Sequence, residues 1–332
     1  MRRFLFAAFA IGLALSSLVA IPTRTMGQEP PLSGIRRIVF VGDSITYSGQ
    51  YVEFLETYLR LKNPELRCEF LNLGLPSETV SGLSEPGHAG GKFPRPDLHE
   101  RFERILNETK PDLVVACYGM NDGIYHPFSE ERFRKFQDGI RFIRDRSLAS
   151  GTKVVHLTPP VFDPEPIQAQ TLPEGLAEYR KPFKGYDDVL DRYSQWLLDR
   201  RPEGWLVVDV HGPMKEVLLL RRQTDPKFRF ANDGVHIDPA GHWIITRQML
   251  DAGGHLPKHD SPSDLEKFVD SDPRGKTVLA LVQKKQRLLK DAWLSAVGHT
   301  RPGMGRGLPL AEAEQKAGEL EAEIRKALGS KS

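Results

Sequence analysis

A serine, a histidine and an aspartate in this sequence have the types and spacing needed for nucleophilic catalysis. Ser44 follows the apolar run Arg37–Val41 after a short turn, and Asp233 precedes His236 by three residues across a glycine. A serine hydroxyl near neutral pH needs a general base, and imidazole has an ordinary pKa of about 6.5. A carboxylate on the second ring nitrogen fixes the tautomer of such a base. The pattern predicts Ser44 as nucleophile, His236 as base and Asp233 as its partner.

Hydrogen-bond donors follow two other apolar runs. Gly74 comes directly after Glu69–Leu73, and Asn121 follows Leu113–Cys117 by a few residues. A backbone N–H without a side chain in the way and a neutral amide can both donate to an oxyanion. Taken alone, each of these residues is also a common turn former. The sequence therefore offers Gly74 and Asn121 as candidate oxyanion donors.

Short apolar runs alternate with amphipathic segments, a pattern typical of a parallel sheet covered on both faces. The expected strands are Arg37–Val41, Glu69–Leu73, Leu113–Cys117, Val154–Leu157 and Leu206–Val210. The expected helices between and after them are Gln50–Lys62, His99–Thr109, Glu130–Ala149, Tyr186–Arg200 and Pro239–Leu250.

The short motifs, in their order and at strand ends, resemble the four blocks of the SGNH (GDSL-like) hydrolase superfamily. The blocks are Gly42-Asp43-Ser44, Gly74, Gly119-Met120-Asn121-Asp122 and Asp233-Gly234-Val235-His236. The resemblance covers roughly residues 36 to 252 and extends to a bacterial carbohydrate-esterase-like subgroup. It implies a flavodoxin-like, doubly wound parallel sheet of five strands in the order 2-1-3-4-5, and ester hydrolysis without a metal or other cofactor. It assigns Ser44 as nucleophile and first oxyanion N–H, Gly74 and Asn121 as further donors, His236 as base and Asp233 as its partner.

Two long connections, 77–97 and 163–185, leave the carboxyl edge of the predicted sheet, where ligands bind in open α/β folds. Such long loops are usually functional or disordered, and we expect a substrate wall that includes Tyr179 and Tyr186. Neither connection contains the continuous apolar run that a fatty chain would need. We therefore expect acetyl esters, above all of carbohydrates. The alternatives are a lysophospholipase, lipase or acyltransferase on the same site, and a glycan-binding module without turnover.

The region after the predicted hydrolase domain (34–253) differs in pattern. Apolar residues at helical spacing predict two helices in the extension 254–332, packed as a hairpin, with a coiled-coil dimer arm as the alternative. The oligomeric state is left open. Arg301, in the loop 298–307, is predicted to fold back to the carboxyl edge and join the substrate wall; the alternative is a solvent-exposed turn.

The amino-terminal residues 1–27 have the charged, apolar and then polar pattern of an export signal, with an uncleaved membrane anchor as the alternative. The expected location is periplasmic or secreted, with no stable membrane insertion of the mature chain. A net charge of +2 provides no basic field for nucleic acid.

The remaining reactive side chains are predicted to be structural. Cys68 and Cys117 fall in runs separated by a third strand, too far apart for a disulfide, so both should be buried free thiols. Asp209 is expected to be a structural carboxylate and His156 a satisfied core residue. The other histidines lack metal-ligand spacing, so no metal site is expected. They are His88, His126, His211 and His242.

Overall fold

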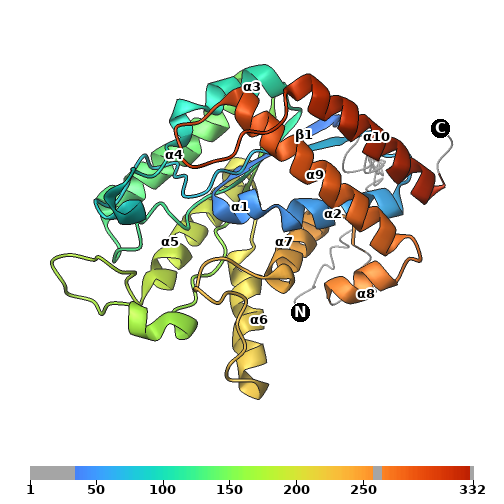
Figure 1. Cartoon of the computed structure of the whole chain (residues 1–332). Coiled ribbons are helices and arrows are strands. Elements are labelled where there is room, and N and C mark those ends of the chain that lie inside the picture. The colour runs from blue at the N-terminus through green and yellow to red at the C-terminus, as the bar shows by residue number, and fades with distance from the viewer. Residues whose placement is uncertain (1–33, 257–263, 330–332) are drawn as a thin grey trace, which may run out of the picture. The chain divides into compact units, whose positions relative to one another are not determined.

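The computed structural model describes residues 34–256 and 264–329, which include a five-stranded parallel sheet (Figure 1). The predicted export signal, 1–27, lies outside the described residues. The strand order is β2-β1-β3-β4-β5, which confirms the predicted order. The strands are β1 (Arg37–Gly42), β2 (Glu69–Asn72), β3 (Leu113–Cys117), β4 (Lys153–Leu157) and β5 (Leu206–Val208).

The central strands are apolar on both faces because helices cover both sides of the sheet. Val39 and Phe40 of β1 are completely buried although their side chains point in opposite directions. The parallel register pairs Phe40 with Asn72 and Gly42 with Cys117. The carboxyl ends of β1, β2 and β3 therefore meet at one edge of the sheet.

Helices pack on the two faces in separate groups (Figure 1). On one face α2 packs against α7, and on the other the Phe136 ring of α4 stacks on Tyr193 of α5. No helix in the described part of the chain is both long and apolar enough to cross a membrane. The α-helices are α1 (Ser44–Ser48), α2 (Gln50–Lys62), α3 (Phe102–Thr109), α4 (Glu130–Ala149), α5 (Tyr186–Leu198), α6 (His211–Thr224), α7 (Pro239–Ala252), α8 (Leu265–Asp270), α9 (Gly275–Val297) and α10 (Leu310–Leu328). The short 3-10 helices are η1 (His88–Gly91), η2 (Leu98–Glu100), η3 (Glu165–Gln170) and η4 (Arg201–Glu203).

Three of these helices are absent from the sequence prediction. The helices α1 and α8 are too short for a periodic pattern to be recognised. In α6, Leu218 is buried but the neighbouring Leu219 and Leu220 are exposed. A run of three leucines has no helical period, which explains why α6 escaped notice.

The carboxyl-terminal helices α9 and α10 pack against each other, and α9 also packs on α2 and β2. Gln286 of α9 donates from Nε2 to the Phe70 carbonyl of β2, at 2.8 Å. Since β2 is the outermost strand on its side, α9 covers part of an open sheet edge. The domain boundary after residue 253 stays a prediction.

A buried ionic cluster fastens this extension to α2. Glu56 is fully buried and accepts from Arg60 at 2.8 Å and from Lys285 of α9 at 2.5 Å. Glu321 of α10 binds both cations, at 2.8 Å and 2.9 Å. Each charge has an opposite partner, which is the condition under which ions are tolerated in a protein interior.

Both cysteines are buried free thiols, as predicted. Cys117 ends β3 and Cys68 directly precedes β2, with β1 lying between these two strands.

Candidate active site

Ser44 is the first residue of α1 and lies where β1 ends. Asp43 caps this helix by accepting from the Ile45 N–H at 2.9 Å. A side chain at Gly42 would lie 2.1 Å from the Thr46 hydroxyl oxygen, so only glycine permits the tight turn from strand to helix. Burial raises the pKa of Asp43 to about 7, against the effect of its hydrogen bond from Ile45. The Ser44 N–H has no acceptor in the described part of the chain and is available for a ligand.

A short turn before α7 brings the predicted base to the predicted nucleophile. His236 Nε2 lies 2.8 Å from Ser44 Oγ, and His236 Nδ1 lies 2.6 Å from Asp233 Oδ2. The second oxygen of Asp233 accepts from the backbone N–H groups of Val235 and His236, at 3.0 Å and 2.8 Å. This contact chain joins the three residues that the sequence proposed as a triad.

The turn itself is held by a residue that the sequence analysis did not identify. The Asp163 N–H donates to the Gly234 carbonyl at 2.9 Å, and the buried Asp163 carboxylate accepts from Arg222 at 2.6 Å. Gly234 has φ +78, and a side chain there would meet the Asp163 carbonyl at 2.4 Å. The connection after β4 thus contacts and positions the His236 turn.

Hydrogen bonding dominates the electrostatics of this pair. Partial burial raises the pKa of Asp233, but the hydrogen bonds from the ring and backbone of His236 outweigh it and lower the pKa below its ordinary value. The hydrogen bond to Asp233 raises the pKa of His236 above 6.5. Their side chains remain 55% and 54% exposed, so the site is open to solvent.

A second serine of α1 also contacts a histidine, which belongs to α7. Ser48 Oγ is 2.9 Å from His242 Nε2. Burial lowers the pKa of His242 to about 3, which leaves the ring neutral and a weak base. Among the described residues, no carboxylate contacts His242 as Asp233 contacts His236, and we interpret this pair as structural.

Asn121 has the geometry of an amide donor. Its Oδ1 accepts from the Tyr125 hydroxyl at 3.1 Å, and its Nδ2 donates to the Glu78 carbonyl at 3.2 Å. These contacts fix the orientation of the amide and leave one N–H of Nδ2 for a substrate. Tyr125, which the sequence analysis missed, has φ +57, a strained conformation for a tyrosine.

Gly74 does not fit its predicted role as an oxyanion donor. Its N–H donates to Asn72 Oδ1 at 2.9 Å, and the residue is buried. A side chain at Gly74 would lie 2.4 Å from the Tyr47 nitrogen. The glycine is therefore needed for close packing behind α1, and its N–H is already engaged.

Ser77 provides the free N–H on this side. The pairing of β1 with the segment after β2 continues to Leu75, whose N–H donates to the Gly42 carbonyl at 2.8 Å. Ser44 and Ser77 each come two residues after this pair. Ser77 has φ +70, and its N–H has no acceptor within residues 34–256 and 264–329. No sequence signal indicated this position, because serine is not typical of the left-handed region.

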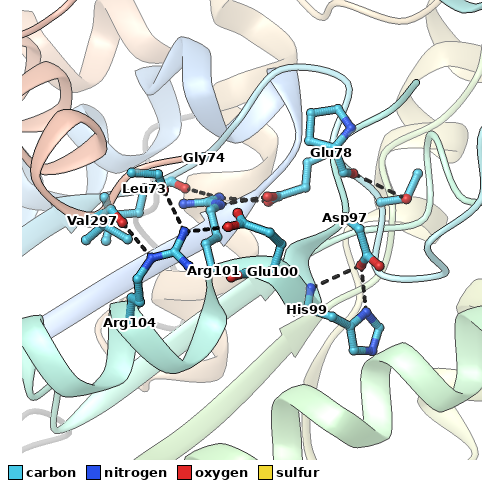
Figure 2. Close-up of polar contacts among 12 residues, drawn as sticks. Leu73, Gly74, Glu78, Asp97, His99, Glu100, Arg101, Arg104 and Val297 are labelled. Atoms are coloured by element: carbon cyan, nitrogen blue, oxygen red, sulfur yellow. Dashed lines mark hydrogen bonds and ion pairs between the residues drawn. The ribbon is translucent and has the colours of Figure 1, made fainter. Parts of the chain in front are cut away.

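A buried network fixes the segment after Ser77 (Figure 2). Glu78 accepts two hydrogen bonds from Arg101, both at 2.7 Å, and one from the Tyr118 hydroxyl at 2.6 Å. Arg101 also donates to the Leu73 carbonyl, so it ties both sides of the loop together. Asp122 Oδ1 accepts from the N–H groups of Val80 and Ser81, both at 2.8 Å.

Of the three residues predicted for the substrate wall, one is excluded by its burial and two stay predictions. Tyr186 is wrong as a wall residue because it is fully buried. Its hydroxyl donates to the Met120 carbonyl and accepts from the Gly123 N–H, so it supports the Asn121 turn from within. Tyr179 is half-buried and packs on the rings of His126 and Phe183. Arg301 lies over Phe93 of the β2–α3 connection, 5.5 Å from the ring centroid.

The remaining predictions concern residues away from the triad. Asp209 Oδ1 accepts from Thr158 and from the Gly212 N–H, both at 3.1 Å, as a structural carboxylate would. His156 is a core residue, but the prediction that its hydrogen bonds are satisfied is wrong. Neither ring nitrogen has a partner among the described residues, and burial lowers its pKa to about 3.

One group in the described part of the chain could hold a metal ion, formed by Asp187, Asp191 and His211. Lys215 already contacts both carboxylates, at 2.8 Å and 2.5 Å. Its ammonium group supplies the positive charge that a metal would bring.

Comparison with known families matches residues 40–244 to the GDSL-like Lipase/Acylhydrolase family. Similar solved structures include a gut microbial diltiazem-metabolizing enzyme, with 13% identity, a TM-score of 0.60, and coverage of 88% of this chain and 95% of that chain. Another is a variant of an acetyl xylan esterase from Geobacillus stearothermophilus, with 21% identity, a TM-score of 0.50, and coverage of 68% and 97%. No curated protein matched by sequence.

The two structures show a shared fold, and the likeness to the first extends beyond the family-matched region. The family match itself includes well over half of the sequence. The chain therefore belongs to the GDSL-like lipase/acylhydrolase family and is a carboxylic-ester hydrolase.

Proposed function

We propose that this enzyme removes short acyl groups, above all acetyl, from carbohydrate esters through an acyl-enzyme on Ser44. The observation that carries the proposal is the contact chain from Ser44 Oγ through the His236 ring to Asp233. An open, half-exposed base admits a large alcohol at the surface.

The reaction would proceed in two steps, acylation of Ser44 and hydrolysis of the acyl-enzyme. Ser44 Oγ attacks the ester carbonyl while His236 Nε2 accepts the hydroxyl proton, and the carbonyl oxygen becomes an oxyanion. The free N–H groups of Ser44 and Ser77 and the amide of Asn121 donate to that oxygen. The C–O bond to the alcohol then breaks, and His236 returns its proton to the departing oxygen. Water repeats the sequence on the acyl-enzyme and releases the acid.

Two features support a short acyl group. The interior beside the oxyanion loop is filled by the buried charges of Glu78 and Arg101 rather than by an apolar tunnel. The β2–α3 connection is held by polar contacts such as Arg95 with Glu85. The fold shared with an acetyl xylan esterase motivates acetylated xylan as the first polymer to test.

The decisive experiment compares two serines of the same helix. Ser44→Ala should lower kcat on 4-nitrophenyl acetate by roughly 10⁴-fold or more, because the nucleophile is lost. Ser48→Ala removes a hydroxyl with a similar histidine contact and should retain activity. A fluorophosphonate should label the wild type at Ser44. Substantial turnover by Ser44→Ala would refute the role of Ser44 as nucleophile. Preference of the wild type for an eight-carbon acyl ester over acetate would refute the proposed short acyl group.

A further inference from the structure

The loop between α9 and α10 contributes a cation to the neighbourhood of the nucleophile helix. Arg301 lies over the Phe93 ring. Burial raises the pKa of Tyr47, and the nearby charge of Arg301 opposes this rise. Tyr47 is on α1, three residues after Ser44. Phe93 also contacts the His88 ring, and His88 and Arg95 share the Glu85 carboxylate. Arg95 lies 5.4 Å from the ring centroid of Tyr125, whose hydroxyl donates to Asn121. These contacts link the loop to the Asn121 side of the site.

The other basic side chains near this loop already have partners. Arg95 binds both oxygens of Glu85, at 2.7 Å and 2.6 Å, and His88 contacts the same carboxylate at 3.5 Å. Lys290 donates to the Tyr47 carbonyl at 2.8 Å and lies 3.8 Å from the centre of the Tyr47 ring.

Arg301 differs from these cations. Across residues 34–256 and 264–329 it has no carboxylate within ion-pair distance, and its one hydrogen bond goes to the Pro302 carbonyl at 3.2 Å. Arg301 is a half-buried residue that lies over the Phe93 ring with most of its guanidinium donors unused, and such a group is suited to a planar anion.

We propose that Arg301 determines specificity for the alcohol half of the ester by binding a carboxylate on that alcohol, as in an acetylated acidic sugar. The proposal rests on the proposed function, since it concerns the leaving group of the same Ser44 reaction. Tyr47 and Phe93 would flank the ring of the alcohol while the Arg301 fork donates hydrogen bonds to the carboxylate. The extension outside the family-matched residues 40–244 would then supply the selectivity.

A packing role for Arg301 makes a different prediction. If the guanidinium only covers Phe93, its replacement should affect charged and neutral esters equally. If it binds a carboxylate, the effect should depend on the charge of the substrate and fall mainly on KM.

The test uses two acetates of similar shape, 4-acetoxybenzoate and its neutral methyl ester, with the full-length protein. In Arg301→Gln, the ratio of kcat/KM for the anionic over the neutral acetate should fall about tenfold relative to wild type, equivalent to about 1.4 kcal/mol. Arg301→Lys should retain part of the ratio, because the charge remains but the planar fork is lost. Arg306→Gln, from the same loop, is the matched control and should keep the wild-type ratio.

The outcomes separate the two proposals. Wild-type hydrolysis of both acetates with an unchanged ratio in Arg301→Gln would overturn the role of Arg301 and leave the esterase function standing. Failure of the wild type to hydrolyse either acetate would overturn both. Activity on the neutral ester also reports whether each variant is folded.

Discussion

The two sides of the proposed active site are built in opposite ways. On the proton-transfer side, Asp233 and His236 lie three residues apart in one turn and are half-exposed. On the oxyanion side, the loop after Ser77 is fixed by Glu78 and Arg101, which are almost fully buried and lie 23 residues apart near the two ends of the β2–α3 connection. The Asp233–His236 arrangement is local and contributes little to the core, whereas the Glu78–Arg101 pair is part of the core. Substitutions on the two sides should therefore separate activity from stability.

The largest effect is expected from Asp233→Asn. Loss of the carboxylate should lower kcat by about 10³–10⁴-fold, because the His236 tautomer and its charged form are no longer stabilised. The free energy of unfolding at neutral pH should hardly change, since the pair is half-exposed. Steady-state kinetics and urea unfolding check the two parts. A large loss of stability would remove the contrast between the two sides.

The pH dependence of kcat/KM tests the effect of Asp233 on the pKa of His236. The hydrogen bond to Asp233 raises the pKa of His236 above 6.5, and the base must be neutral to accept a proton. The wild-type kcat/KM should therefore rise with pH through a midpoint above 6.5, and Asp233→Asn should shift this midpoint downward. The small stabilising effect of His236 is present below pH 6.5 and is lost as pH rises through the raised pKa. An unshifted midpoint in the variant would contradict the assignment.

Arg101→Met is expected to lower stability, in contrast to Asp233→Asn. Glu78 would be left as a buried charge without its partner, which typically costs about 3–5 kcal/mol of stability. Urea unfolding should show this loss. Arg146→Met, which breaks an exposed pair with Glu103, is the matched control and should cost less than about 1 kcal/mol. Equal stability of the two variants would show that burial does not distinguish these ion pairs.

The smallest effect is expected from Lys290→Met. This lysine of α9 donates to the carboxyl end of the nucleophile helix, at the Tyr47 carbonyl. Its loss should lower kcat by about threefold while KM stays constant, because a cation at a helix carboxyl end contributes only about 0.3–1 kcal/mol. Lys290→Arg should restore kcat. A change in KM alone would mean that Lys290 contacts substrate rather than positions Ser44.

The contrast also explains which parts could be predicted from sequence. The Asp233 turn was predictable because both partners are local and their chemistry is specific. Gly74 was assigned wrongly because its N–H is taken by the Asn72 side chain, and only the continued pairing with β1 reveals Ser77. The strand order followed from the family resemblance, but the Arg101–Glu78 contact joins residues 23 positions apart with no local signal.

Aromatic residues were predicted less well than the strands. Tyr186 and Tyr179 come from one connection and looked equivalent in sequence. The fold buries Tyr186 beneath the Asn121 turn and leaves Tyr179 half-buried. Burial depends on what packs above a residue, which its neighbours in sequence do not specify.

The cover that α9 places on the outer strand β2 has a consequence for solubility. Without Gln286 the Phe70 carbonyl and its neighbours would form an unprotected strand edge, a template on which further copies of the chain can add strands. Removal of the extension would also leave Glu56 and Arg60 without Lys285 and Glu321. A shortened chain that keeps Ser44, Asp233 and His236 should therefore aggregate, because the helices after residue 264 protect this strand edge from self-association.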